Sequence, residues 1–307
     1  MMRRYIFLIL LTILSSCKLT RYAKIPETDY LTFSFDLQGR ERFYYIHTPN
    51  NQTIFSGKLP LLLVLHGRFG SGKQIMEQAG FNELSNTESF LVVYPDGFSR
   101  SWADGRGKSP ADKEKVDDVM FLEMVVSDVK SKFPVDMTRV YMAGHSNGGF
   151  MTQRMLFEKS DLFRGGVSVA AQISLYVVKN FKPISPISVA IMAGTEDPLV
   201  PYYGGYVRDG GEILSVEDSI QRWKTWNGCT NEKQEQAKDD FQDETSLDII
   251  TYPDCKANSL VRLYRVNGGG HAWPGQEQKI PFIKMGRPTQ ELNATTEIWS
   301  FFKSLEK

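Results

Sequence analysis

The chain contains 307 residues, a length that fits either one large α/β domain or two domains of average size. Apolar residues make up 41% and charged residues 23%, which disfavours a disordered, collagen-like or multi-span membrane protein. The 36 basic and 36 acidic side chains cancel, so the overall charge predicts no nucleic-acid partner and favours a neutral or small molecule.

Residues 1–16 have the composition of an export signal. Two arginines precede an apolar run at 5–14, which is too short to cross a bilayer as a mature helix, and Ser-Ser-Cys17 follows. This pattern resembles a lipoprotein signal peptide, after which Cys17 is lipidated as the new first residue. The alternative is an ordinary signal peptide with an incidental cysteine. We expect an exported lipoprotein, anchored in the outer membrane and facing the periplasm or the cell surface, with residues 17–29 as a polar tether.

Residues 30–307 are expected to form one domain in which strands and helices alternate. Residues 31–37 alternate strictly between apolar and polar side chains, and 43–47 resume the pattern after Gly39, which predicts an antiparallel hairpin. Continuous apolar runs of the kind buried in parallel sheets then alternate with helical patterns. The predicted strands are 61–65, 90–94, 140–143, 166–170, 187–193 and 260–266, and the predicted helices are 73–87, 117–133, 148–159 and 293–305.

This alternation predicts an α/β fold with a mainly parallel sheet, the antiparallel hairpin at the N-terminal side and helices on both faces. One stretch does not fit the pattern. In residues 231–248 acidic side chains outnumber lysines, and we expect a solvated insertion there.

One motif indicates the chemistry. Gly144-His145-Ser146-Asn147-Gly148 follows the apolar strand 140–143 and precedes the helix 148–159. In this strand, turn and helix context, the G-x-S-x-G pattern is typical of a nucleophile elbow. The turn is so tight that side chains at the two glycines would collide with the neighbouring strand and helix. We therefore predict Ser146 as the nucleophile.

A serine hydroxyl needs a histidine to take its proton and a carboxylate to orient that histidine. In α/β-hydrolases both partners follow the serine along the chain, and His271 is the only histidine downstream of Ser146. For the acid, Asp197 is best placed, because it follows the buried strand 187–193 at the carboxyl end where α/β sites collect. The remaining alternatives for the acid are Glu196, Asp209 and Asp218.

Two backbone amides are expected to bind the oxyanion of the tetrahedral intermediate. One belongs to Asn147, the residue after the nucleophile. The other belongs to the loop after strand 61–65, where we assign it to Arg68. His66, in the same loop, is interpreted as a scaffold residue that bonds the local backbone.

Aromatic residues on loops beside these motifs are candidates for substrate binding. Trp102, Tyr202 and Trp273 are assigned this role, because flat rings stack on sugars and phenolic acids. The alternative is that each ring closes the edge of the core.

With these motifs assembled, the chain resembles the secreted esterase family of polyhydroxybutyrate depolymerase-like proteins, feruloyl esterases and acetylxylan esterases. The resemblance covers about residues 30–305, and its most specific block is Gly269-Gly270-His271-Ala272-Trp273-Pro274-Gly275. It implies the α/β-hydrolase fold and ester hydrolysis by Ser146, Asp197 and His271 without a cofactor or metal. Arg68 and the following phenylalanine are bulkier than the family leads us to expect, which bears on the fit of the substrate.

The cysteines add a structural expectation. Export permits disulfides, and Cys229 and Cys255 are the natural pair once Cys17 is lipidated. The segment Trp226-Asn227-Gly228-Cys229 also looks like the disulfide region of the resembled family.

The leading functional hypothesis is a lipid-anchored serine esterase that removes feruloyl or acetyl groups from plant cell-wall polysaccharides or their fragments. Its expected partners are an acylated carbohydrate or small ester, and the membrane through the lipid alone. One alternative is a polyhydroxyalkanoate depolymerase or oligomer hydrolase. Another is a non-catalytic glycan-binding lipoprotein, although binding alone needs none of the three catalytic residue types. Peptide-bond cleavage stays open because it uses the same machinery.

Overall fold

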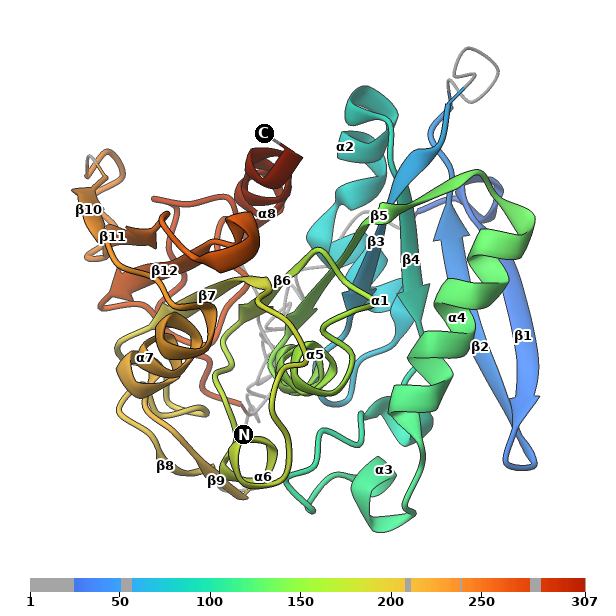
Figure 1. The fold of residues 1–307 in the computed structure, drawn as a ribbon, viewed down its shortest axis with the longest axis horizontal. Helices are drawn as coiled ribbons and strands as arrows, with labels where there is room; N and C mark the ends of the chain where they lie inside the picture. Colours follow the sequence, from blue (N-terminus) through green and yellow to red (C-terminus); the bar gives the residue numbers. More distant parts are fainter. Residues whose placement is uncertain (1–24, 51–56, 208–210, 238, 277–282, 307) are drawn as a thin grey trace, which may run out of the picture.

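The molecule is built on one twisted sheet that crosses Figure 1 from side to side. The computed structural model describes residues 25–50, 57–207, 211–237, 239–276 and 283–306. In these residues the strands of the sheet are, in chain order, β1 (Leu31–Leu37), β2 (Arg40–His47), β3 (Leu59–Leu65), β4 (Leu91–Pro95), β5 (Val135–His145), β6 (Gly165–Val169), β7 (Ser188–Gly194), β10 (Lys233–Gln236), β11 (Ser246–Tyr252) and β12 (Val261–Asn267).

The ten strands pair in the order β1-β2-β4-β3-β5-β6-β7-β12-β11-β10. The six strands from β4 to β12 in this order run parallel, and pairing at both ends of the sheet is antiparallel. A separate small hairpin joins β8 (Gly205–Val207) to β9 (Gly211–Ile213). The predicted parallel sheet with its N-terminal antiparallel hairpin is therefore confirmed.

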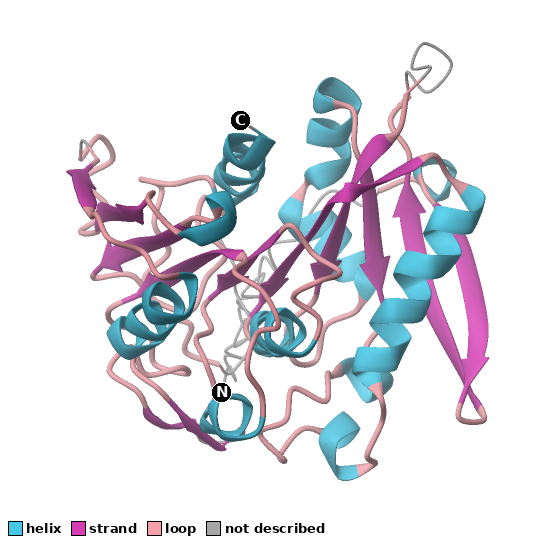
Figure 2. Ribbon diagram, in the orientation of Figure 1, coloured by secondary structure: helices cyan, strands magenta, loops and turns pink. Residues whose placement is uncertain are grey.

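Helices cover both faces of the sheet, as Figure 2 shows. The helices are α1 (Gly72–Ala79), α2 (Phe81–Glu88), α3 (Pro110–Lys113), α4 (Asp118–Lys132), α5 (Asn147–Glu158), α6 (Leu175–Asn180), α7 (Val216–Asn227) and α8 (Ala294–Lys303). Successive side chains of a strand point to opposite faces. Leu61, Leu63 and Leu65 accordingly join a core with α4, α5 and α7, whereas Leu62 and Val64 join a second core with α1, α2 and α8. This double burial explains why β3 is apolar along its whole length.

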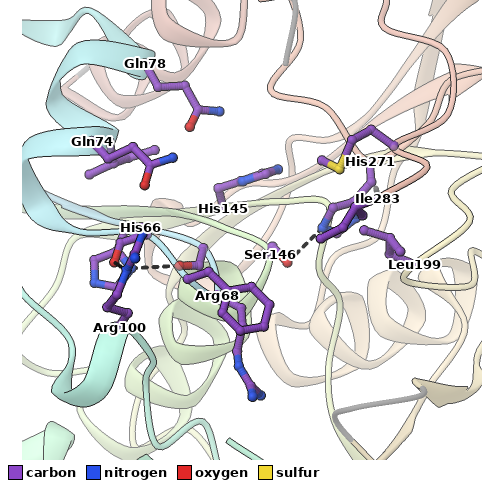
Figure 3. Close-up of a pocket in the computed structure, with 15 residues that line it drawn as sticks. His66, Arg68, Gln74, Gln78, Arg100, His145, Ser146, Leu199, His271 and Ile283 are labelled. Atoms are coloured by element: carbon purple, nitrogen blue, oxygen red, sulfur yellow. Dashed lines mark hydrogen bonds between the residues drawn. The ribbon is translucent and has the colours of Figure 1, made fainter. Parts of the chain in front are cut away.

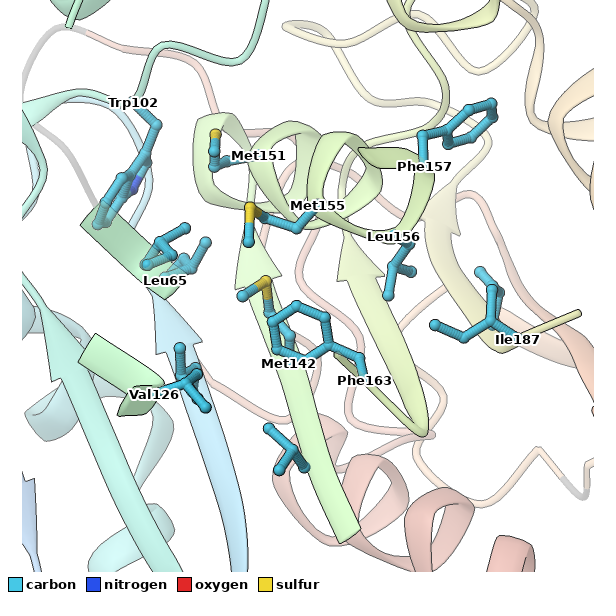
Figure 4. Close-up of a cluster of buried hydrophobic side chains, with 14 of the residues drawn as sticks. Leu65, Trp102, Val126, Met142, Met151, Met155, Leu156, Phe157, Phe163 and Ile187 are labelled. Carbon is cyan, nitrogen blue, oxygen red and sulfur yellow. The ribbon is translucent and has the colours of Figure 1, made fainter. Parts of the chain in front are cut away.

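The packing of α5 against the sheet fixes the place of the predicted nucleophile. Met151, Met155 and Leu156 of α5 lie over the sheet, where Met142 of β5 joins them in one buried cluster (Figure 4). Because β5 leads directly into α5, this cluster holds both sides of the turn that carries Ser146.

The structure differs from the prediction in two segments. The helix predicted at 73–87 is two helices, because Gly80 between them adopts a left-handed φ of 66° and ends α1. The stretch 231–248 is largely exposed, as predicted for a solvated insertion, but it also contains β10 and the start of β11, which extend the sheet. All four residues of β10 are exposed, so its composition is polar and gives no apolar alternation to recognise.

The structure contains a disulfide between Cys229 and Cys255, which joins the end of α7 to the segment after β11. Among the described residues no helix is both long and apolar enough to span a bilayer. The predicted signal peptide (1–16), Cys17 and residues up to 24 lie outside the described residues.

Candidate active site

Ser146 lies on the tight turn between β5 and α5. Its backbone is strained, with φ 53° and ψ −118°, and its amide donates a hydrogen bond to the carbonyl of Val169 at 2.8 Å. The flanking glycines allow this turn. A Cβ at Gly148 would lie 2.5 Å from the carbonyl oxygens of Leu65 and His66, and a Cβ at Gly144 would collide with the backbone of Gly148. The geometry is that of the predicted nucleophile elbow.

Three predicted residues from separate loops meet at this turn. The Ser146 hydroxyl donates to Nε2 of His271 at 2.8 Å, and Nδ1 of His271 donates to Oδ2 of Asp197 at 2.6 Å. The other carboxylate oxygen of Asp197 accepts the amides of Leu199 and Val200, both at 2.8 Å. Figure 3 shows Ser146 pointing at His271, with the hydrogen bond dashed. His271 and Asp197 are almost fully buried.

The alternative acids do not contact His271. Glu196 is exposed and lies 3.7 Å from the guanidinium of Arg287, and Asp218 bonds Ser215 at the start of α7. Asp209 lies outside the described residues. Within the described part of the chain, Asp197 is thus the carboxylate that can hold the Nδ1–H tautomer of His271 and leave Nε2 free to accept the serine proton.

The two predicted oxyanion donors also lie at the site. Asn147 is the first residue of α5, so its amide has no acceptor within the helix. In the His66 loop, Phe69 and Gly70 donate their amides to backbone carbonyls, whereas the Arg68 amide has no partner in the described residues. Arg68 also lines the cavity above Ser146. Two amides without a partner in the described residues therefore lie at the site, and their role as oxyanion donors stays a prediction.

Comparison with known proteins identifies the fold family. A model described as the prolyl oligopeptidase family matches residues 90–197. The putative esterase NocK of Nocardia uniformis subsp. tsuyamanensis is 29% identical over 251 residues, which are 77% of this chain and 72% of that protein. Feruloyl esterase B of Piromyces equi is 27% identical over 231 residues, 73% of this chain but 42% of that esterase.

Among solved structures, an acetyl xylan esterase from Aspergillus awamori has a TM-score of 0.53 at 17% identity, covering 75% of this chain and 89% of the other. The chain has the α/β-hydrolase fold, and it is similar to proteins named as esterases. The matched region spans less than half of the Piromyces enzyme, because that enzyme is a longer chain.

In this α/β-hydrolase His66 holds the oxyanion loop in place. Its Nδ1 lies 2.7 Å from the carbonyl of Gly67, to which it must donate, and its Nε2 accepts the amide of Gly97 at 2.9 Å. One ring nitrogen donates and the other accepts, which requires the neutral form of the His66 ring. Burial lowers the pKa of His66 to about 4, and burial beside His271 lowers the pKa of His145 to about 3.

The lowered pKa values of these two histidines predict that the folded protein loses stability at acidic pH. In the unfolded chain they bind protons below about pH 6.5, whereas in the folded chain they stay neutral until near pH 4 and 3, so falling pH favours unfolding. We expect the free energy of unfolding to fall by about 1 kcal/mol per pH unit for each histidine from pH 6.5 downwards. Urea unfolding between about pH 4.5 and 7.5 measures this slope.

The matched comparison is His66→Gln against His47→Gln in the hairpin. The slope should become shallower in His66→Gln than in His47→Gln. Equal slopes in the two variants and in the wild type would mean that His66 titrates alike in the folded and unfolded chains.

The predicted aromatic residues do not reach the cavities. Trp102 and Trp273 have no exposed surface, and their indole N–H groups donate to the carbonyl of His66 and the hydroxyl of Thr295. Tyr202 is buried and donates to Glu217. The substrate-binding assignment is therefore corrected: these rings close the core beneath the site, since large flat side chains fill space there while their polar atoms find partners.

Several residues that surround Ser146 lie outside the motifs. One chamber of about 230 Å³ reaches His145 and Gln74, and a second of about 650 Å³ reaches Arg106 and Phe150 (Figure 3 shows the first). Gln74 lies on α1, Phe150 on α5 and Arg106 on a loop. Because these elements are distant in sequence, spacing along the chain does not reveal the side chains that line the chambers.

Proposed function

We propose that this α/β-hydrolase is a serine carboxylesterase. The observation that supports the proposal is the continuous chain of hydrogen bonds from Ser146 through His271 to Asp197, with two chambers that Ser146 lines. A carbonyl carbon beside Ser146 then has room for an acyl group on one side and an alcohol group on the other.

The reaction follows from the geometry in two steps. Ser146 Oγ attacks the ester carbonyl while His271 Nε2 takes its proton, and the amides of Asn147 and Arg68 bind the oxyanion. The C–O bond to the alcohol breaks as His271 returns the proton to the leaving oxygen. Water then attacks the acyl-serine, gives its proton to His271, and the acid leaves as Ser146 regains the proton.

We propose acyl groups on plant cell-wall polysaccharides, or on their fragments, as the substrate. The support is the similarity to proteins named feruloyl esterase and acetyl xylan esterase. Feruloyl and acetyl groups differ greatly in size, and either the 230 Å³ or the 650 Å³ chamber has room for an acetyl group.

A parallel rate comparison tests the proposal. The substrates are methyl ferulate, acetylated xylan, hydroxybutyrate oligomers and p-nitrophenyl acetate as the general ester control. Turnover of the first two above the oligomers supports the cell-wall assignment, and the reverse order replaces it with the polyester alternative. If folded protein cleaves none of the four, the glycan-binding alternative replaces catalysis.

We also propose that the chain is an exported lipoprotein held in the outer membrane through Cys17. The support is the sequence pattern of residues 1–17 alone.

For the anchor, we expect Cys17→Ala to abolish labelling by radioactive palmitate and to move the protein out of the membrane fraction. Membrane binding of a lipoprotein depends on its acyl chains. A variant that has lost all of them should therefore move to the aqueous phase in detergent phase partitioning. Ser16→Ala, which keeps the cysteine, is the matched control. Unchanged labelling and partitioning in Cys17→Ala would contradict the anchor.

A further inference from the structure

Positive side chains collect around the site, although the whole chain has 36 basic and 36 acidic residues. The larger chamber is lined by Arg68, Arg106 and Lys284, and the smaller one by Arg68 and Arg100. Among the described residues that line either chamber, Asp104 is the one acidic side chain. A cleft lined by one sign of charge concentrates ligands of the opposite sign.

Most of this positive charge has no counter-charge. Arg68 lies over the ring of Phe69 at 5.0 Å, and Arg100 donates to the carbonyl of Gly70 at 3.4 Å. Neither arginine, nor Lys284, forms an ion pair within the described part of the chain. The two chambers therefore present a net positive surface to whatever enters them.

Arg106 is the best ordered of these cations. Its Nε and Nη2 both donate to the carboxylate of Asp104, at 3.1 and 2.7 Å, and its guanidinium lies 3.6 Å from the centre of the Phe150 ring. Asp104 is in turn bonded by the side-chain amide of Asn147 at 2.5 Å. The carboxylate and the ring thus fix the plane of the guanidinium and the direction of its remaining edge.

Within the described part of the chain, the edge of the guanidinium that faces away from Asp104 includes an N–H group without a hydrogen-bond acceptor. The side chain of Arg106 is 7% exposed, and its Nη1 is buried with no hydrogen-bond partner in the described residues. A buried N–H of a charged group that stays unpaired is costly, and such groups in native structures call for an explanation. The exposed part of the Arg106 side chain lines the larger chamber, so an anionic ligand that enters there and displaces what covers Nη1 would supply the missing acceptor.

We propose that Arg106 binds a carboxylate of the substrate in the larger chamber, so that the enzyme prefers esters that carry a negative charge. This inference rests on the proposed esterase function and names its substrate class. The guanidinium is held ready for an anion before the substrate arrives, and Arg68 and Lys284 add attraction from the same chamber.

The carboxylate has two possible sources within one chemistry. It can belong to the acyl part, as in a half-ester of a dicarboxylic acid. It can belong to the alcohol part, as in an oligomer of hydroxy acids or an ester of a sugar that carries a uronic acid. In both cases the charge and the scissile carbonyl lie in one chamber, since Ser146 and Arg106 both line it.

Matched substrate pairs separate these sources. For the acyl part, the mono(4-nitrophenyl) ester of adipic acid is compared with the same ester of adipic acid monoamide. For the alcohol part, 4-acetoxybenzoate is compared with 4-acetoxybenzamide. Each pair keeps shape and removes one charge. We expect kcat/KM to be roughly tenfold higher for the anion in one pair, the size typical of a hydrogen bond to a charged group.

Variants test whether Arg106 is the cause. The measured quantity is the ratio of kcat/KM between anion and amide, which cancels any loss that both substrates share. In Arg106→Gln the ratio should fall to near one, mainly through a higher KM for the anion. Arg106→Lys keeps the charge but loses the fixed fork, so an intermediate ratio is expected. Lys233→Gln, on the exposed strand β10, is the matched control and should keep the wild-type ratio.

The dependence of the anion preference on salt is a second readout, which would not change if Arg106 had only a structural role. Raising ionic strength from about 0.01 M to about 0.15 M shortens the Debye length from roughly 30 to 8 Å, which should reduce the preference contributed by Arg68 and Lys284. Equal kcat/KM within both pairs, with the neutral esters still cleaved, would overturn the carboxylate proposal and leave the esterase proposal standing. An anion preference that persists undiminished in Arg106→Gln would also overturn it. Failure to cleave any ester would instead contradict the proposed function itself.

Discussion

Replacing Ser146 with alanine is expected to lower kcat for aryl esters by roughly 10⁴- to 10⁶-fold, because the nucleophile disappears while the fold is kept. His271→Ala should cost about as much, since Nε2 of His271 is the group within hydrogen-bonding distance of the serine hydroxyl. The double variant should lose little more than either single variant, because residues that act as one unit are not additive. Steady-state kinetics on p-nitrophenyl acetate measure all three.

Asp197→Asn should cost less than loss of the serine or histidine, because those two groups survive and only the tautomer of His271 is mis-set. A serine-directed fluorophosphonate should label the wild type at Ser146 and leave Ser146→Ala unlabelled. The control is Ser304→Ala, at the end of α8, which should keep full activity. If Ser146→Ala were folded by circular dichroism and hydrolysed aryl esters at the wild-type rate, the catalytic assignment would be wrong.

Gly148→Ala should lower the free energy of unfolding by about 3 kcal/mol or more and remove activity. The added Cβ would lie 2.5 Å from two backbone carbonyl oxygens, those of Leu65 and His66, and backbone cannot swing aside as a flexible side chain does. Overpacking of this kind costs typically 1–3 kcal/mol, and a rigid neighbour places the cost at the upper end. Relief of the clash must separate β3 from α5, which also displaces Ser146.

Urea unfolding followed by circular dichroism measures the loss, and Gly57→Ala is the matched control. A Cβ at Gly57 meets no heavy atom within 4 Å, so that variant should stay within about 0.5 kcal/mol of the wild type. Wild-type stability and activity in Gly148→Ala would show that the elbow does not need this close approach.

Local pattern was sufficient for the centre of the sheet and for the elbow. Strands such as β3 are buried on both faces, so their whole sequence is apolar and recognisable. The order of serine, acid and histidine along the chain then selected three residues that the structure brings within hydrogen-bonding distance. The polar edge strand β10 gave no such pattern, because no face of it is buried.

The lining of the chambers could not be predicted for a different reason. Aromatic type and proximity to a motif suggested Trp102 and Trp273, yet whether a ring faces a cavity or the core depends on which loops pack above it. Arg106 gave the opposite case, because nothing in its sequence neighbourhood marks it. Asp104 is only two residues away, but Phe150, over which the guanidinium lies, belongs to α5. That contact is tertiary, and a single sequence does not encode it as a spacing.

The helix α8 has a consequence for the order of events during synthesis. It covers one face of the sheet, where Trp299 stacks on Phe90 at 3.7 Å and Phe302 stacks on Tyr141 at 4.4 Å. The helices α1 and α2 cover part of this face, but α8 is translated after every strand, so the area that α8 covers stays open to water until α8 has left the ribosome. Folding is then completed only after α8 has been synthesised, and until that moment the uncovered apolar area is available to a chaperone. Such a delay agrees with the proposed export, because a chain that has not completed its fold can still pass through a translocation channel.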